Sequence, residues 1–390
     1  MIVGIDKIAF FTSPYYIDMT DLANARGEDP NKYLIGIGQQ KQSVIPPTQD
    51  VVTLAANAAD EILDEADKQA IDMVIFGTES GIDQSKSAAI YVQSLLGISK
   101  SARSFEIKQA CYGATAGIQM AFDHVTQHPK SKVLVLAADI ARYGSNTPGE
   151  VTQGGGAVAM LITAQPDILA LDGQSAFYSD DIMDFWRPAY RREALVDGHY
   201  STDVYIDFFN RTWNQYQAQT NRHLDDFKAI AFHLPFTKMG LKALRSVVHD
   251  HPSAVGLLEQ FEFSRQYNAL VGNLYTGSLY LSLLSLLANS DDLKPGDRIG
   301  LFSYGSGAQG EFYSGKIIAD LQSQKLAEPV THLLNNRIKL TISEYEKMYQ
   351  QGLPMNGRDY EFDITKDHNR FVLAGRKANR RLYKDTKNRI

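Results

Sequence analysis

The order of secondary-structure elements is repeated along this chain, and the repeat limits its possible folds more than any other feature. In the first half, residues 71–76 form a short apolar run that predicts a buried strand, and the run ends at a polar turn, residues 77–81. A helix is predicted from residue 110 to about residue 125, and residues 132–138 predict a second buried strand. This order is typical of an α/β unit.

The second half contains the same unit. Residues 227–232 predict a strand, residues 269–289 predict a helix without charged residues, and residues 298–304 predict the next buried strand. A chain of 390 residues is long enough for two such halves. We therefore expect an α/β fold made of two duplicated halves, residues 1–166 and residues 167–390.

The uncharged segment 269–289 has nearly the length of a membrane span. Its first half contains Gly272, Asn273 and Thr276, so too few solidly apolar positions remain for a span, which needs about 20. A helix buried inside a large core explains the segment better.

Charge and cysteine content narrow the classes of partner. The net charge of −6 gives no general attraction to nucleic acid or anionic lipid, and one cysteine cannot form an internal disulfide. No basic leader with a long apolar stretch begins the sequence. We expect a cytoplasmic protein with no nucleic-acid or membrane partner. Residues 366–389 contain nine Lys or Arg and two Asp, and a solvated face explains this stretch better than nucleic-acid binding.

Four polar residues occupy matching positions in the two halves. Glu79 and His233 follow equivalent strands, and Cys111 and Asn273 stand where equivalent helices begin. Open α/β sheets bind ligands at strand ends and helix N-termini. If the halves pack with approximate two-fold symmetry, the four side chains converge on one site.

Each of the four residues has a functional and a structural interpretation. Cys111 is a nucleophile if the helix N-terminus favours its thiolate, or an inert buried cysteine. His233 exchanges a proton near neutral pH, or is structural. Glu79 is a general base if burial raises its pKa, or a surface carboxylate. Asn273 donates to a substrate carbonyl, or caps a helix.

Two further patterns suggest ligand binding. Lys238 and Lys242 lie at i and i+4 of a predicted helix, where they either bind a phosphate group or remain solvated. Residues 305–310 match the G-x-G-x-x-G pattern, but residues 311–315 read as extended chain where a dinucleotide site needs a helix. No Cys/His cluster predicts a metal site.

Five motifs contain the candidate site residues. They are Gly77-Thr-Glu79-Ser, Gln109-Ala-Cys111-Tyr-Gly113, Phe232-His233-Leu-Pro235-Phe, Gly272-Asn273-Leu-Tyr-Thr-Gly-Ser278 and Ser303-Tyr-Gly-Ser306-Gly307. Together they resemble 3-hydroxy-3-methylglutaryl-CoA (HMG-CoA) synthase of the bacterial type, a member of the thiolase superfamily. The resemblance runs from the N-terminus to the C-terminal region without an evident insertion. It implies a thiolase-like fold with layers in the order αβαβα.

The resemblance implies an acyltransferase that condenses acetyl-CoA with acetoacetyl-CoA and water to HMG-CoA, a precursor in the mevalonate pathway of isoprenoid biosynthesis. Cys111 would carry the acetyl group as a thioester, Glu79 would remove a proton from it, and His233 would polarise and protonate the ketone oxygen. The family is homodimeric and needs no metal or organic cofactor.

The same resemblance implies binding residues. Asp197 resembles an acidic residue that the family uses near the site. Lys238 and Lys242 would face the CoA moiety. The acyl groups and the substrate pocket would be contacted by Tyr143, Thr152, Ser201, Asn273 and Ser306.

Two alternatives remain open. A β-ketoacyl synthase of the initiating type shares the fold and a Cys-His-Asn set, but it forms its carbanion by decarboxylation and does not need the carboxylate of Glu79. A catalytically silent acyl-CoA binding protein of the same fold is the other alternative. In that case, Cys111→Ala would change no function.

Overall fold

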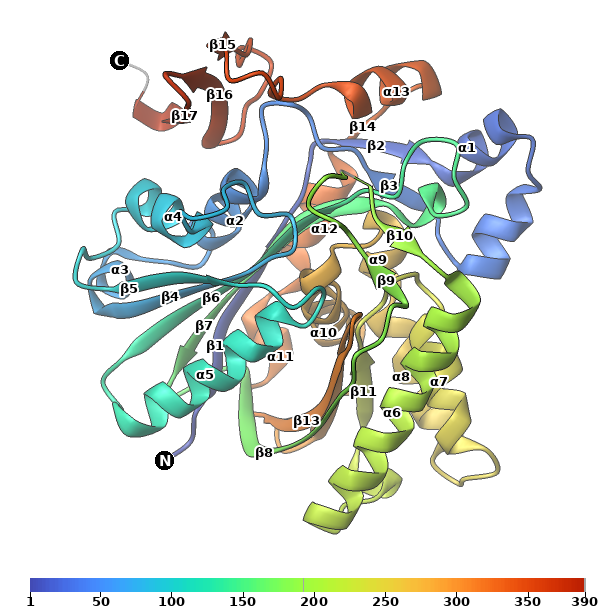
Figure 1. Ribbon diagram of the computed structural model, residues 1–390. Coiled ribbons are helices and arrows are strands. Elements are labelled where there is room, and N and C mark those ends of the chain that lie inside the picture. The colour runs from blue at the N-terminus through green and yellow to red at the C-terminus, as the bar shows by residue number, and fades with distance from the viewer. Residues whose placement is uncertain (192, 389–390) are drawn as a thin grey trace.

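Residues 1–191 and 193–388 are described by a computed structural model, and a sheet of nine strands runs through its centre (Figure 1). The sheet has the order β11-β12-β13-β8-β1-β7-β6-β4-β5. In chain order these strands are β1 (Gly4–Phe11), β4 (Ile71–Gly77), β5 (Arg103–Ile107), β6 (Lys132–Ala141), β7 (Gly154–Thr163), β8 (Leu169–Ser179), β11 (Ala229–Phe232), β12 (Arg298–Gly305) and β13 (Gln309–Ile317).

The sheet is arranged symmetrically about the antiparallel pair β1 and β8, in which Ile5 lies opposite Leu169. Outward from β1, strands β7 and β6 are antiparallel neighbours, and β6 is parallel to β4. Outward from β8, strands β13 and β12 are antiparallel neighbours, and β12 is parallel to β11. This repeat confirms the duplicated α/β fold. The boundary predicted after residue 166 lies between β7 and β8 and stays a prediction.

Helices pack on both faces of the sheet. Helices α5 (Gly113–Gln127) and α10 (Ser278–Asn289) share one apolar core with both halves. Figure 1 shows α10 at the centre of the molecule and α5 in front of the strands of the N-terminal half. Helices α2 (Val51–Asp60) and α4 (Ala88–Leu96) cover the outer face of the N-terminal half. The outer face of the C-terminal half is covered by α6 (Gly198–Thr220), α7 (Met239–Val248) and α8 (Ala254–Ser264).

This layering explains the apolar runs of the sequence. In β4 the side chain of Val74 packs on the outer helices, whereas Ile75 packs in the central core. Strands that are buried on both faces read as continuous apolar runs.

The predicted helix 269–289 is wrong as a single element. It consists of α9 (Gln266–Val271) and α10, with a 3₁₀ turn, Tyr275–Gly277, before α10. Gly272 between them has φ +94°, and a Cβ built on it would lie 2.0 Å from the carbonyl oxygen of Gln153. The chain therefore leaves the helix where two backbones touch. Among the described residues, no helix is long and apolar enough to cross a membrane.

The basic C-terminal stretch packs on the N-terminal half through ion pairs. Arg381 lies 2.9 Å from Asp50, and Arg370 pairs with Asp60 and Asp385. Arg389 lies outside the described residues. Extended chain after the glycine pattern is confirmed, because residues 309–317 form β13.

Shorter elements complete the chain. They are β2 (Tyr15–Asp18), α1 (Met19–Arg26), a π-helix (Lys32–Ile37), β3 (Lys41–Ser43), α3 (Glu65–Ala70), 3₁₀ turns at Glu150–Thr152, Leu224–Asp226 and Thr386–Asn388, β9 (Phe185–Trp186), β10 (Leu195–Val196), α11 (Leu321–Gln324), α12 (Ala327–Asn335), β14 (Ile338–Lys339), α13 (Ile342–Gln350), β15 (Tyr360–Glu361), β16 (Phe371–Lys377) and β17 (Arg380–Asp385).

Candidate active site

Loops of the two halves meet where β4, β12, α5 and α10 begin or end. The backbone N–H of Ala114, in the first turn of α5, donates to Thr276 Oγ1 at 2.7 Å, and Thr276 belongs to the turn before α10. A Cβ built on Gly305, at the end of β12, would lie 2.5 Å from the carbonyl oxygen of Gln109. The loop of Cys111 therefore touches both C-terminal loops that contain predicted site residues.

Cys111 and Glu79 are in direct contact. The Cys111 Sγ lies 3.4 Å from Glu79 Oε1, and the cysteine is 8% exposed. Cys111 belongs to a small cluster with Phe185 and Tyr275, and Tyr143 packs against it. A thiol and a carboxyl group at this distance can exchange a proton.

Glu79 has the raised pKa that a general base at neutral pH needs. Burial raises its pKa to about 8, with a further contribution from Asp139, whereas Arg187 and the bond to Cys111 act in the opposite direction. The Arg187 guanidinium lies 3.5 Å from Glu79 Oε2 and also donates to the Glu79 carbonyl oxygen. The interpretation as a surface carboxylate is wrong, because the Glu79 side chain is 7% exposed.

Asp139 is a second buried carboxylate, which sequence reasoning missed. Its Oδ1 accepts from Thr78 Oγ1 at 2.8 Å, Glu79 N at 2.9 Å and Ser80 N at 2.8 Å, and its Oδ2 accepts from Thr276 N at 3.1 Å. Burial raises the pKa of both carboxyl groups, but these four donors favour the ionised form of Asp139. The proton is therefore held preferentially by Glu79.

The predicted thiolate of Cys111 is not what this environment favours. Helix α5 begins two residues later, at Gly113, and Tyr112 is its N-cap residue. Burial, and then the Glu79 and Asp139 carboxyl groups, raises the pKa of Cys111 well above its usual value. The expectation of a thiolate considered the helix N-terminus, but neither the burial of the thiol nor the two carboxyl groups. The thiol must therefore lose its proton during the reaction.

His233 is buried and neutral. Its backbone N–H donates to the carbonyl oxygen of Phe302 at 2.8 Å, and its own carbonyl oxygen accepts from Tyr205 Oη at 2.6 Å. Burial lowers its pKa to about 3, so the prediction of a proton exchange near neutral pH is wrong for this environment. The buried Nδ1 has no hydrogen-bond partner among the described residues.

Asn273 supports the turn before α10 but is not the N-cap residue of that helix, and its donation to a substrate carbonyl stays a prediction. Its Oδ1 accepts from Tyr275 N and Ser278 Oγ, each at 2.8 Å, which fixes the turn before α10. Its Nδ2 donates to Tyr143 Oη at 3.1 Å. Because Tyr143 packs on the Cys111 cluster, this amide group lies at the candidate site.

Asp197, the acidic residue that the resemblance implied, lies at the surface, and its role near the site stays a prediction. Asp197 is exposed and accepts from Tyr200 N, so it caps α6. Asp184 is fully buried and accepts from Ser201 Oγ at 3.2 Å and from Gly307 N at 3.0 Å.

Other predicted binding residues lie around the cluster. The Ser306 carbonyl oxygen accepts from the Gln109 side chain at 3.3 Å, and the Thr152 carbonyl oxygen accepts from Asn273 N at 3.1 Å. Lys238 Nζ donates to Ile35 O at 2.6 Å, and the exposed Lys242 has Nζ 5.3 Å from the ring centre of Phe236. Within the described part of the chain, neither lysine forms a hydrogen bond or an ion pair with Cys111 or Glu79.

Known proteins are similar to this chain in sequence and in fold. A family model described as "Hydroxymethylglutaryl-coenzyme A synthase N terminal" matches residues 1–167, and its C-terminal counterpart matches residues 169–254 and 258–370. The chain is 54% identical over 355 residues to a hydroxymethylglutaryl-CoA synthase of Enterococcus faecalis, an alignment that covers 90% of this chain and 93% of the relative.

Two solved structures are similar over nearly their whole length. A crystal structure of HMG-CoA synthase complexed with CoA gives a TM-score of 0.96 at 46% identity, covering 99% of this chain and 100% of that chain. MvaS in complex with 3-hydroxy-3-methylglutaryl coenzyme A gives a TM-score of 0.87 at 37% identity, covering 98% and 99%.

Proposed function

The chain belongs to the hydroxymethylglutaryl-CoA synthase family and condenses acetyl-CoA with acetoacetyl-CoA and water, and we propose that Cys111, Glu79 and His233 carry the steps of this reaction. The single observation that supports these roles best is the buried contact of 3.4 Å between Cys111 Sγ and Glu79 Oε1. It joins a nucleophile to a base whose pKa lies near the operating pH.

In the first step, Cys111 attacks the carbonyl carbon of acetyl-CoA. Glu79 in its ionised form takes the thiol proton, so that the raised pKa of Cys111 does not prevent attack. The bond between the acetyl carbon and the CoA sulfur breaks, and CoA leaves as the thiol after taking the proton from Glu79, which is thereby ionised again. Cys111 then holds the acetyl group as a thioester.

In the second step, Glu79 removes a proton from the acetyl methyl group. The resulting carbanion attacks the ketone carbon of acetoacetyl-CoA, and its oxygen becomes an alkoxide. The neutral His233 donates a hydrogen bond to that oxygen, because a histidine with a pKa of about 3 is not an imidazolium at neutral pH. The protonated Glu79 supplies the proton that the alkoxide needs.

Water ends the cycle by cleaving the thioester to Cys111. The acyl carbon leaves as the free carboxylate of HMG-CoA, and the Cys111 thiol is restored. Thioester hydrolysis makes the overall condensation effectively irreversible. No step needs a metal ion or an organic cofactor, so turnover should survive dialysis against a chelator. An activity that a chelator abolished would contradict this.

The remaining assignments concern binding. Asn273 and Ser306 contact the acyl groups, and Tyr143, Thr152 and Ser201 line the substrate pocket. Lys238 and Lys242 contact the phosphates of CoA, so Lys242→Ala should raise the KM for both thioesters and leave kcat unchanged. Equal KM values for the variant and the parent would contradict the assignment.

We also propose a homodimer that acts in the cytoplasm and supplies the mevalonate pathway of isoprenoid biosynthesis. Strand β5 at the sheet edge offers backbone groups to a second copy. Sedimentation at micromolar concentration should give twice the chain mass, and a monomer would exclude the dimer. Cell fractionation tests the location, and a block in isoprenoid synthesis after gene loss tests the pathway.

One experiment tests the central proposal. The protein is incubated with acetyl-CoA alone, intact mass is measured for an acetyl adduct, and acetoacetyl-CoA is then added while CoA release is followed. The parent should form the adduct and then consume acetoacetyl-CoA, whereas Cys111→Ala should do neither. If no adduct formed but a malonyl thioester were consumed, the chain would act as a β-ketoacyl synthase instead.

A further inference from the structure

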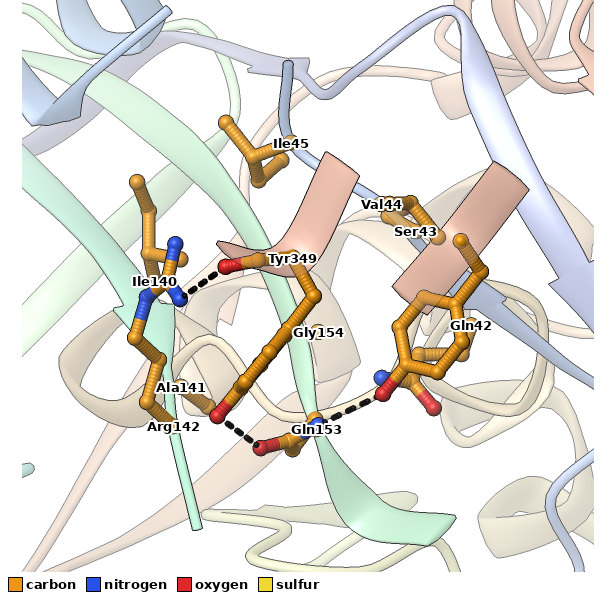
Figure 2. Close-up of a pocket in the computed structure, with 11 residues that line it drawn as sticks. Gln42, Ser43, Val44, Ile45, Ile140, Ala141, Arg142, Gln153, Gly154 and Tyr349 are labelled. Carbon is orange, nitrogen blue, oxygen red and sulfur yellow. Dashed lines mark hydrogen bonds between the residues drawn. The ribbon is translucent and has the colours of Figure 1, made fainter. Parts of the chain in front are cut away.

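Gln153 is a buried glutamine between the candidate site and helix α13, and Figure 2 shows its side chain bonded to Tyr349. Its Oε1 accepts from Tyr349 Oη at 3.1 Å, from Tyr143 N at 2.7 Å and from Gly144 N at 3.2 Å. Its Nε2 donates to Tyr345 Oη at 3.1 Å. Because three groups donate to Oε1, only one orientation of the amide group satisfies the network.

The same short segment holds the two residues whose side chains meet at the site. The Gln153 side chain fixes the backbone of Tyr143, while the carbonyl oxygen of Thr152 accepts from the backbone N–H of Asn273. Tyr143 Oη and Asn273 Nδ2 are 3.1 Å apart. One segment therefore sets both ends of the contact between Tyr143 and Asn273.

Helix α13 anchors Gln153 from the other side. Tyr345 Oη donates to Glu150 Oε1 at 3.0 Å, and Glu150 accepts from Arg26 at 2.8 Å. Arg142 Nη1 donates to the carbonyl oxygen of Tyr349 at 2.9 Å (Figure 2). A cavity of about 20 Å³ borders these residues.

We propose that Gln153 is a positioning residue that ties Tyr143 to helix α13 and so keeps the phenol of Tyr143 against Asn273 in the acyl pocket. Buried backbone N–H groups need an acceptor. Without the Gln153 amide oxygen, the backbone N–H of Tyr143 must shift to find another acceptor, while that of Gly144 keeps only Tyr349 Oη, at 3.2 Å. The inference rests on the proposed function, because it assigns Tyr143 to the substrate pocket.

The test compares Gln153→Leu with Gln260→Leu. Gln260 is a buried glutamine of α8 that accepts a hydrogen bond from Ser290 and is the matched control. We expect Gln153→Leu to raise the KM for acetoacetyl-CoA roughly tenfold while the acetyl adduct still forms, because it disturbs the position of a binding group. Gln260→Leu should leave both readouts unchanged.

A double variant separates positioning from general damage. Tyr143→Phe removes the hydroxyl that meets Asn273, and if Gln153 acts through Tyr143, the double variant should lose no more than Gln153→Leu alone. The proposal would be overturned if the effects of the two single variants on the KM for acetoacetyl-CoA multiplied in the double variant. It would also be overturned if Gln153→Leu had the same kinetics as Gln260→Leu. If Gln153→Leu does not fold, Tyr349→Phe serves in its place, with Tyr216→Phe as its control because Tyr216 bonds to Ser314 away from the site.

Hydrogen exchange gives a readout that does not depend on activity. A peptide that covers Tyr143 and Gly144 should exchange faster in Gln153→Leu than in Gln260→Leu or the parent. Unchanged protection would overturn the proposal even if the kinetics changed. A failure of the proposed function would look different, because the unaltered protein would then form no acetyl adduct while the exchange comparison still reported on Gln153.

Discussion

The two halves of the chain place polar side chains at equivalent points, but they give them opposite electrostatic surroundings. In the N-terminal half, Glu79 and Cys111 contact each other, and Asp139 and Arg187 act on the charge of Glu79. In the C-terminal half, the imidazole of His233 is neutral and its Nδ1 has no partner among the described residues. The duplicated fold places these side chains at equivalent points, and burial together with nearby charges determines the protonation state of each side chain.

This contrast assigns different work to the halves. Groups that gain and lose protons at neutral pH gather in the N-terminal half, around strands β4 and β6. The C-terminal half offers hydrogen bonds whose protonation does not change, such as the amide of Asn273. The N-terminal half should therefore control the chemical steps, and the C-terminal half should orient the acceptor substrate.

Glu79→Gln should break the contrast most strongly. The amide cannot accept the methyl proton, so condensation should fall by roughly 10²–10⁴-fold. Acetylation should fall less than condensation, because the variant lacks the base for the thiol proton but also lacks one of the charges that raise the pKa of Cys111. Adduct formation by intact mass and CoA release after acetoacetyl-CoA addition measure the two steps separately.

The control for this prediction is Glu106→Gln. Glu106 lies on the neighbouring strand β5 and accepts from the backbone N–H of Ala88, so its loss should leave both steps unchanged. Equal loss of acetylation and condensation in Glu79→Gln would show that Glu79 serves the first step as much as the second. The assignment of Glu79 mainly to the condensation step would then be wrong.

His233→Ala should have the next largest effect. Removing one donor to a developing oxyanion costs condensation roughly 10²-fold, with the acetyl adduct formed as before. Because His233 stays neutral, the pH profile of the parent between pH 6 and 9 should contain no contribution from it. His124→Ala is the control for the loss of an imidazole ring, because His124 lies on α5 and bonds to Asp72 on β4. If the parent showed a titration near pH 6 that His233→Ala abolished, a neutral His233 would be contradicted.

The sequence predicted much of this arrangement because its main signals are local. Runs such as residues 71–76 and 298–304 are apolar because strands of the central sheet are buried on both faces, and the motif residues follow those strands. The break at Gly272 was not predicted, since it depends on a backbone contact with Gln153, more than a hundred residues away.

The supporting residues were harder to find. Asp139 did leave a signal, because it is the lone carboxylate in the apolar strand Lys132–Ala141. Asp184 and Arg187 lie beside β9 in chain without a helical or alternating period, and Gln153 lies in a short connection before β7. Their roles depend on partners from distant segments, which sequence spacing does not reveal.

Arg187→Gln should have the smallest effect and should sharpen the electrostatic side of the contrast. Glu79 must be ionised to act as a base, and its pKa of about 8 means that the condensation rate of the parent rises with pH up to that value. The Arg187 cation lowers this pKa from 3.5 Å away, so its removal raises the pKa further and moves the rise to higher pH. A shift of one pKa unit would lower the condensation rate at pH 7 about tenfold, and the deficit should shrink above pH 9.

Two variants control for this prediction. Arg187→Lys should keep most of the effect of the charge. Arg191→Gln, in the exposed part of the same loop, should leave the profile of condensation rate against pH unchanged. A deficit of the same size at every pH would mean that Arg187 supports the loop and does not set the charge of Glu79.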